Sequence, residues 1–186
     1  LLVATHPHAD HIGGMDKVID KFNVKKIALP DVTEKDSPTT KTYERLLDSI
    51  IRNDVPAVAP VQGDVLYEDG QFSVTALNGN ESGVDTGDLN DYSIGTLITH
   101  GDIKMMLTGD AHINTEKQIL SSGMNIKSHI MTAGHHGSST SMAQAFLDAV
   151  NPELIILSYA EGNSYGHPHR ETTDKINAGG YNSLNT

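Results

Sequence analysis

The sequence predicts an α/β fold in which apolar strand segments alternate with amphipathic helices. Residues 39–54 place apolar side chains at the i, i+3, i+4, i+7 and i+8 positions of a helix with one buried face. After Pro56 the pattern changes to a series of short β-rich segments. A chain of 186 residues with 37% hydrophobic residues is long enough to form one domain with a sizeable core.

The first part of the chain alternates between the two kinds of element. Apolar runs predict strands over 1–5 and 25–30, the second stopped by Pro30. Helical spacing predicts helices over 15–22 and 39–54. The strand over 1–5 ends directly before a group of histidines, so we expect that group at the edge of a sheet.

The second part predicts a run of strands followed by alternating helices and strands. The expected strands cover 57–61, 71–77, 92–99, 102–108, 128–133 and 153–160, with a hairpin turn at 100–102. Helices are expected over 113–123, over 141–150 and from Arg170 onward. The apolar strand 153–160 is expected to be buried on both faces. Residues 78–91 predict a loop, which is either a solvated connection or a loop on the substrate side.

Composition and charge exclude several classes of protein. The chain contains no cysteine, which excludes disulfides and thiolate metal sites. No apolar run has the length of a membrane span. The formal net charge is −11 and no Lys/Arg cluster is present, whereas a nucleic-acid binder usually shows a basic face. Nucleic acid is therefore disfavoured as a partner, though not excluded.

The segment THPHADHIGG contains four candidate metal ligands. His6 and His8 are two residues apart, so on an extended segment both imidazoles face the same side. Asp10 and His11 follow where the chain must turn toward Gly13 and Gly14. Imidazole nitrogen and carboxylate oxygen are ligands that zinc accepts. Four donors in six residues could bind two metal ions from one short segment.

Three later motifs add candidate ligands at the ends of predicted strands. Asp110 follows Gly109 in LTGDA, and a carboxylate there could bridge two cations by offsetting their repulsion. The motif GHHGS carries His135 and His136, whose side chains should face opposite ways on an extended segment. The motif NSYGHPH carries His167. Loops that each follow a strand of one sheet can converge on one rim.

These motifs resemble those of a known family. THPHADHIGG matches the HxHxDH signature of metallo-β-lactamase-fold hydrolases, and LTGDA, HHGS and YGHP follow in order. In this order they resemble the extracytoplasmic hydrolase domain of competence DNA-uptake proteins (ComEC-like) and are similar to those of bacterial phosphorylcholine esterases. The resemblance extends from the first residues to about Pro168. It implies a four-layer αββα sandwich, and it favours an extracytoplasmic or secreted location.

The resemblance also implies a role for each motif residue. The first metal would be bound by His6 and His8, the second by Asp10 and His11, and Asp110 would bridge them. His167 would complete the second site. One of the paired histidines would complete the first site, with His136 favoured as the ligand and His135 as the donor to the substrate. Asp10 would also orient the nucleophile. Ser138 and Tyr165 are either donors to the substrate or ordinary loop residues.

Two departures from the family pattern matter. Many members carry a ligand histidine before the Gly-Asp motif, where this chain has Asn90. Asn90 and Ser93 are therefore expected to be hydrogen-bonding supports or ordinary hairpin residues. The fold also normally begins with several strands before HxHxDH. We expect a single domain over 1–186, either truncated at both ends or completed by strands from a partner chain, as in a homo-oligomer.

The implied function is that of a hydrolase with two divalent metal ions, for which zinc is favoured and Mn²⁺ or Fe²⁺ is also acceptable. The favoured substrate is a phosphodiester, either a polymer such as DNA or a small molecule such as a phosphorylcholine ester. A lactam, lactone or thioester could be cleaved by the same metals. The competing hypothesis is a metal-binding accessory or interaction module without turnover.

Overall fold

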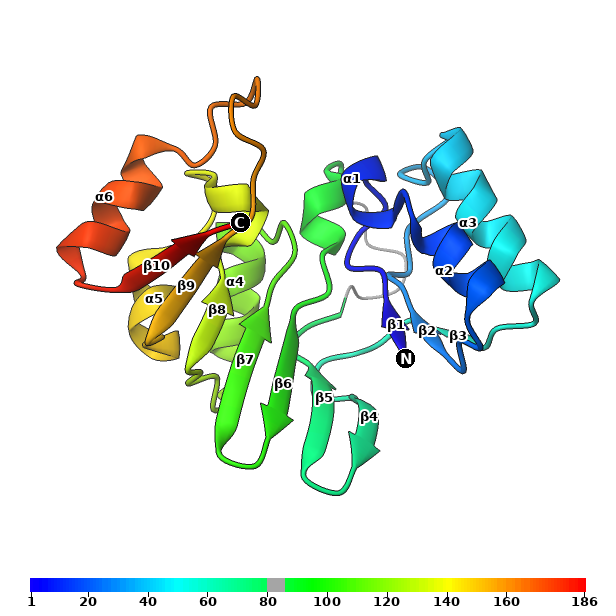
Figure 1. Cartoon of the computed structure of the whole chain (residues 1–186), viewed down its shortest axis with the longest axis horizontal. Helices are drawn as coiled ribbons and strands as arrows, with labels where there is room; N and C mark the ends of the chain where they lie inside the picture. Colours follow the sequence, from blue (N-terminus) through cyan, green and yellow to red (C-terminus); the bar gives the residue numbers. More distant parts are fainter. Residues whose placement is uncertain (80–85) are drawn as a thin grey trace.

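The computed structural model, which describes residues 1–79 and 86–186, has two β-sheets with helices on their outer sides (Figure 1). The smaller sheet is parallel, in the order β1-β2-β3. Its strands are short: β1 Leu2–Val3, β2 Ile27–Ala28 and β3 Ala57–Val58. The helices packed beside it are α1 Ala9–Ile12, α2 Met15–Lys21 and α3 Lys41–Arg52.

The larger sheet has the order β10-β9-β8-β7-β6-β5-β4. It is antiparallel from β4 to β7 and parallel from β7 to β10. Its strands are β4 Val65–Asp69, β5 Phe72–Ala76, β6 Thr96–His100, β7 Ile103–Leu107, β8 Ile130–Thr132, β9 Leu154–Leu157 and β10 Asn182–Asn185. The parallel strands are joined by α4 Ile113–Ser121, α5 Gln144–Val150 and α6 Arg170–Ala178. The loops that follow β7, β8 and β9 therefore begin at one edge of the sheet.

Hydrophobic packing holds the layers together. The helices α4 and α5 pack against the larger sheet through a core that includes Met106, Phe146 and Ile155. A separate core, which includes Ile19 and Leu46, joins α2 and α3 to the smaller sheet. The two sheets meet through a third cluster of buried residues: Ala28, Leu66, Val74 and Ala76. The order helices, sheet, sheet, helices confirms the expected architecture.

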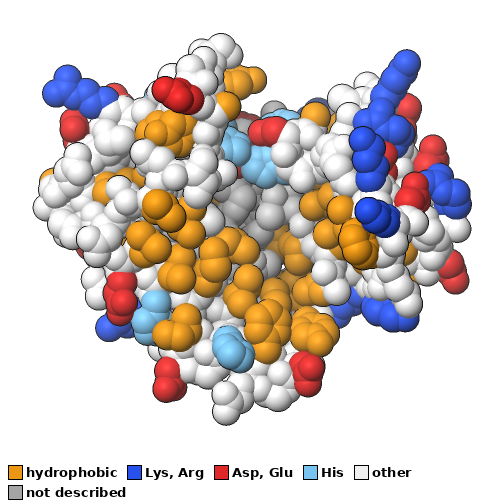
Figure 2. Space-filling model, viewed as in Figure 1, with side chains coloured by type: hydrophobic (Ala, Val, Ile, Leu, Met, Phe, Trp, Pro, Cys, Tyr) orange, Lys and Arg blue, Asp and Glu red, His pale blue; other side chains and the backbone are white. Residues whose placement is uncertain are grey.

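The other face of the larger sheet carries exposed apolar side chains. Figure 2 shows hydrophobic side chains gathered on this face. Ile103 of β7 and Leu184 of β10 each keep about half of their surface exposed, at 53% and 52%. In β9, Ile155 is buried but its neighbour Ile156 is only half-buried. The prediction that this strand is buried on both faces was therefore wrong, because the helices cover one face only.

Several elements differ from those predicted. The strand β4 lies where no strand was predicted, and β10 has the polar sequence NSLN and is held by parallel pairing with β9. Of the predicted loop 78–91, residues 80–85 lie outside the described part, and Leu89–Tyr92 form the 3-10 helix η1. Strand β6 consequently begins at Thr96 rather than at residue 92. In the described ranges, no helix is long and apolar enough to cross a bilayer.

Candidate metal centre

Loops from both halves of the fold meet between the two sheets. His6 and His8 follow β1, and Asp10 and His11 lie on the short helix α1. Asp110 comes after β7, and the paired histidines form the 3-10 turn η2, Gly134–Gly137, after β8. The turn at Asp10 is helical rather than irregular, because Ile12 N–H and His11 N–H both donate to the carbonyl of His8.

A first cluster joins His6, His8 and Asp110. The His6 Nε2 and His8 Nδ1 atoms are 3.0 Å apart, so the two imidazoles face the same side as predicted. The His6 Nε2 atom is 3.7 Å from Asp110 Oδ2. The His6 ring is fully buried and its Nδ1 lies 3.2 Å from the Thr5 hydroxyl, which fixes the orientation of the ring.

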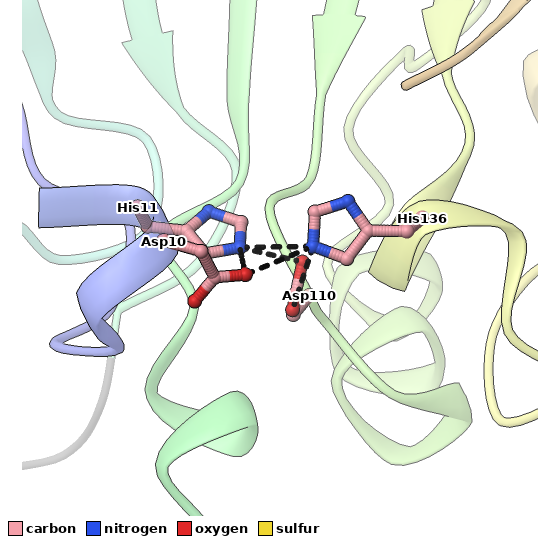
Figure 3. Close-up of side chains that lie close together, drawn as sticks. All are labelled: Asp10, His11, Asp110 and His136. Atoms are coloured by element: carbon pink, nitrogen blue, oxygen red, sulfur yellow. Dashed lines mark hydrogen bonds and ion pairs between the residues drawn. The ribbon is translucent and has the colours of Figure 1, made fainter. Parts of the chain in front are cut away.

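A second cluster joins Asp10, His11, Asp110 and His136 (Figure 3). The His11 Nε2 atom lies 3.2 Å from His136 Nε2, 3.3 Å from Asp110 Oδ1 and 3.4 Å from Asp10 Oδ2. The His136 Nε2 atom lies 3.3 Å from Asp10 Oδ2 and 3.6 Å from Asp110 Oδ2. Asp110 belongs to both clusters, as expected of a bridging carboxylate.

The spacing of these atoms fits ligands around a cation. Zinc bonds to nitrogen and oxygen of about 2.0–2.1 Å, arranged tetrahedrally, place neighbouring ligand atoms about 3.3 Å apart. The separations given above run from 3.0 to 3.7 Å, and all ligand atoms of each cluster lie within 4.8 Å of one another. The His136 Nδ1–H donates to the Ser158 carbonyl at 2.8 Å, so the Nε2 lone pair is directed at the cluster. The donor chemistry and the spacing therefore both fit a pair of divalent ions.

Burial and the neighbouring charges favour a neutral His6 and an ionised Asp110, whereas they favour the protonated form of His11 in the absence of a metal ion. Burial lowers the pKa of His6 to about 3, and the neighbouring His11 contributes to this shift. Burial works against ionisation of Asp110, but hydrogen bonding from His11 and the other nearby imidazoles bring the pKa of Asp110 to about 2. Burial likewise opposes protonation of His11, but Asp110 outweighs it and raises the pKa of His11. Neutral His6 and ionised Asp110 are the forms that bind metal ions.

The paired histidines do not lie on an extended segment. His135 and His136 both adopt positive φ, at 49° and 54°, and Gly137 follows at 83°. Two successive non-glycine residues in this region are strained, which is typical of functional sites. Both side chains reach the same carboxylate, since His135 Nε2 is 3.8 Å from Asp110 Oδ2. The prediction that they face opposite ways was wrong, because it assumed extended backbone.

The grouping of His136 and His167 also differs from the predicted one. His136 lies with Asp10 and His11 and not with the first cluster, in which it was expected. His167, expected in the second cluster, belongs to neither; its ring centre is 6.2 Å from that of His136 and 5.4 Å from that of His135. With the positive φ of the turn, His136 rather than His167 groups with Asp10 and His11 of α1. His135 approaches the Asp110 oxygen that also faces His6.

Of the residues predicted to support the site or contact the substrate, each has its own environment in the structure. The Ser93 hydroxyl accepts the Asp110 N–H at 3.1 Å, which positions the shared carboxylate. The Asn90 side-chain oxygen is buried and has no hydrogen-bond partner within the described ranges. Ser138 is buried and bonds to Thr140, so it serves the loop rather than the substrate. Tyr165 is 78% exposed.

Sequence reasoning missed two contributors to the site. Thr140 Oγ1 lies 3.0 Å from His135 Nδ1, and this contact orients the His135 ring. His112 Nδ1 is 3.3 Å from Asp91 Oδ1, and its ring centre is 5.2 Å from that of His135. The position of His112, two residues after Asp110, was the available signal.

A cavity of 460 Å³ opens beside the second cluster. Its walls include Asp10 and His136 on the metal side and Ser158, Asn163, Tyr165 and His167 from the loop after β9. This volume is within the range of sites for small organic ligands. A substrate in the cavity would contact the second cluster directly.

Comparison with known proteins identifies a family model and two relatives that match this chain. Residues 1–159 match the family model described as the metallo-beta-lactamase superfamily. The chain is 29% identical over 171 residues to ComE operon protein 3 of Bacillus subtilis (strain 168), covering 91% of this chain and 21% of that protein. It is 33% identical over 90 residues to competence protein ComA of Neisseria gonorrhoeae, covering 48% of this chain and 13% of that protein. The chain thus spans about a fifth or less of these relatives.

Solved structures share the fold at low sequence identity. The diiron β-hydroxylase CmlA from Streptomyces venezuelae superposes with a TM-score of 0.63 at 15% identity, covering 100% of this chain and 43% of that one. Igni18, a metallo hydrolase from Ignicoccus hospitalis, gives a TM-score of 0.59 at 15% identity, covering 99% and 74%. At this identity the likeness concerns the fold alone.

Proposed function

The chain belongs to the metallo-beta-lactamase superfamily, and from this premise we propose that it is a hydrolase that uses two divalent metal ions to cleave phosphodiesters. The observation that carries the proposal is the sharing of Asp110 between two clusters of metal-binding side chains. Such a shared carboxylate is suited to hold two cations close together. We propose zinc as the metal, because most of the donors are imidazoles.

Some residues of the site would bind the metal ions, and others would position the water and the phosphate. His6 and His8 would hold one ion, and Asp10, His11 and His136 the other, with Asp110 between them. When bound, the ions supply Lewis acidity, which lowers the pKa of a water and stabilises negative charge developing on the phosphate. The exposed Asp10 carboxylate faces the cavity and can accept a hydrogen bond from the attacking water. His135, outside both clusters, can donate to a phosphate oxygen or leaving group.

The choice of a phosphodiester rests on chemistry and on the relatives. A pair of cations can bind the two non-bridging oxygens of a phosphodiester while activating the nucleophile. One of the relatives named above, from Neisseria gonorrhoeae, is described as a competence protein. The net charge of −11 favours a short phosphodiester over a long polyanion.

The test combines metal content with activity. The purified protein, loaded with zinc or manganese, is assayed on bis-(p-nitrophenyl) phosphate and on nitrocefin, a lactam. We expect about two ions per chain and hydrolysis of the phosphodiester only. His8→Ala should lose at least one ion and most of the activity. His100→Ala removes an exposed histidine at the far end of β6 and should change neither quantity.

Other results would favour the competing functions. Two bound ions without turnover of either compound would indicate a metal-binding module. Turnover of nitrocefin alone would indicate a C–N bond hydrolase. Fewer than one bound ion in the wild-type protein would overturn the metal assignment itself.

A further inference from the structure

Three rings form a column from the solvent to the second metal-binding cluster. The Tyr165 and His167 rings are stacked at 21°, with centres 5.7 Å apart. The His167 and His136 rings are stacked at 25°, with centres 6.2 Å apart. Tyr165 is therefore the outermost ring of a nearly parallel series that ends on a candidate metal ligand. All three rings line the 460 Å³ cavity.

The loop that carries Tyr165 is held firmly although the ring is exposed. The Asn163 side-chain oxygen accepts the Tyr165 N–H at 3.2 Å and the His167 N–H at 3.0 Å. The Asn163 amide donates to the carbonyl of His167 at 2.6 Å and to that of Ala160 at 2.9 Å. The Tyr165 carbonyl lies 3.2 Å from His169 Nε2. An aromatic ring on such a braced loop is preorganised, so contacts to it cost little conformational entropy.

The described walls of the cavity offer no permanently positive side chain that could bind the rest of the substrate. Among the described residues, those lining this cavity include Asp10 but no lysine or arginine. Beyond the phosphate itself, a substrate must therefore be bound by contacts that do not depend on ion pairs. Two tyrosines line the cavity: Tyr159 is partly buried against the hydrophobic core, whereas Tyr165 is 78% exposed and so offers the larger free planar surface for such a contact.

We propose that Tyr165 is a stacking platform for a nucleobase that flanks the scissile phosphodiester. This inference rests on the proposed phosphodiesterase function. Every nucleobase has a flat face that can stack on a tyrosine ring, independently of charge. A quaternary ammonium group such as choline is less well served, because its recognition usually uses a cage of several aromatic rings, and of the two tyrosines that line the cavity only Tyr165 is largely exposed. Tyr165 would thus determine specificity without taking part in bond cleavage.

The first test compares two substrates and two variants. The metal-loaded protein is assayed on a thymidine dinucleotide and on an abasic dinucleotide with the same sugar-phosphate backbone. We expect Tyr165→Ala to lower the ratio of their kcat/KM values about 5- to 150-fold, the range of base–aromatic stacking. Tyr165→Phe keeps the ring without the hydroxyl and should keep the wild-type ratio.

The second test measures binding rather than turnover. Calorimetric titration compares thymidine monophosphate, ribose 5-phosphate and phosphorylcholine on the wild-type protein and on Tyr165→Ala. We expect the thymidine compound to bind most tightly to the wild type and to lose this advantage in the variant. Tighter binding of phosphorylcholine would overturn the nucleobase assignment.

The outcomes separate this inference from the proposed function. Absence of phosphodiester hydrolysis by the metal-loaded wild type would overturn the function, and with it the inference. Hydrolysis with equal losses on both dinucleotides in Tyr165→Ala would overturn only the inference. An equal loss of the ratio in Tyr165→Phe would assign the effect to the hydroxyl and would also overturn the platform.

Discussion

Gly109 lies between β7 and Asp110, where the two halves of the candidate metal centre pack closely. The variant Gly109→Ala therefore perturbs this packing. Gly109 adopts a positive φ of 55°. A Cβ added there would lie 2.9 Å from the Thr5 Cβ and 3.3 Å from the Ser93 hydroxyl. Thr5 precedes the ligand His6, and Ser93 accepts the amide hydrogen of Asp110. Gly109→Ala should therefore strain the backbone and also displace supports of both clusters.

The magnitude follows from two separate costs. Placing an alanine in the left-handed region costs about 1–2 kcal/mol. Forcing a methyl group into a packed site typically costs about 1–3 kcal/mol more. We expect Gly109→Ala to lower the free energy of unfolding in urea by about 2–5 kcal/mol. The control is Gly70→Ala, where φ is 60° and nothing lies within 4 Å of an added Cβ. The free energy of unfolding of this control should fall only by the backbone cost of about 1–2 kcal/mol.

Metal affinity gives a second measurement on the same pair. Because Thr5 and Ser93 position His6 and Asp110, Gly109→Ala should bind zinc more weakly than Gly70→Ala in competition with a chromophoric chelator. Equal losses of stability and equal zinc affinities in the two variants would refute the reasoning that Gly109 is required for close packing at the centre.

Two further predictions concern stability and can be checked by urea unfolding. Because the pKa of His6 is lowered to about 3 in the folded chain, the unfolded chain binds more protons between pH 6.5 and 3. The free energy of unfolding of the metal-free protein should therefore fall as the pH falls through this window, by at most about 5 kcal/mol. His6→Gln removes the titrating group and should flatten this decline. An unchanged slope would contradict the assignment of the pH dependence to His6. The buried carboxylate of Glu116 accepts the backbone N–H groups of Met142 and Ala143 before α5. Glu116→Ala should lower the free energy of unfolding by about 2–4 kcal/mol, because it leaves these groups unpaired. The control Glu171→Ala changes an exposed side chain of α6 and should cost under about 0.5 kcal/mol. Equal losses in the two variants would argue against the role of Glu116.

Much of the fold was predictable because its signals are local. The amphipathic spacing of α3 and α5 depends on residues within one helix, and the hairpin of β6 and β7 depends on two strands that are adjacent in the chain. Strand β10 was not predictable in this way, because its polar side chains give no alternation and its structure depends on pairing with β9. The half-buried side of β9 depends likewise on which face the helices cover.

For the candidate site, the sequence by itself determined the donor chemistry and its position at strand ends. His6, His8 and Asp110 carry metal-binding atoms wherever they lie, and the apolar runs before them predict the edge of a sheet. Only the tertiary structure decided how the donors group. The positive φ values of His135 and His136 turn both rings to Asp110, and His136 joins Asp10 and His11. That choice depends on loops far apart in the chain meeting between two sheets, and no local pattern encodes it.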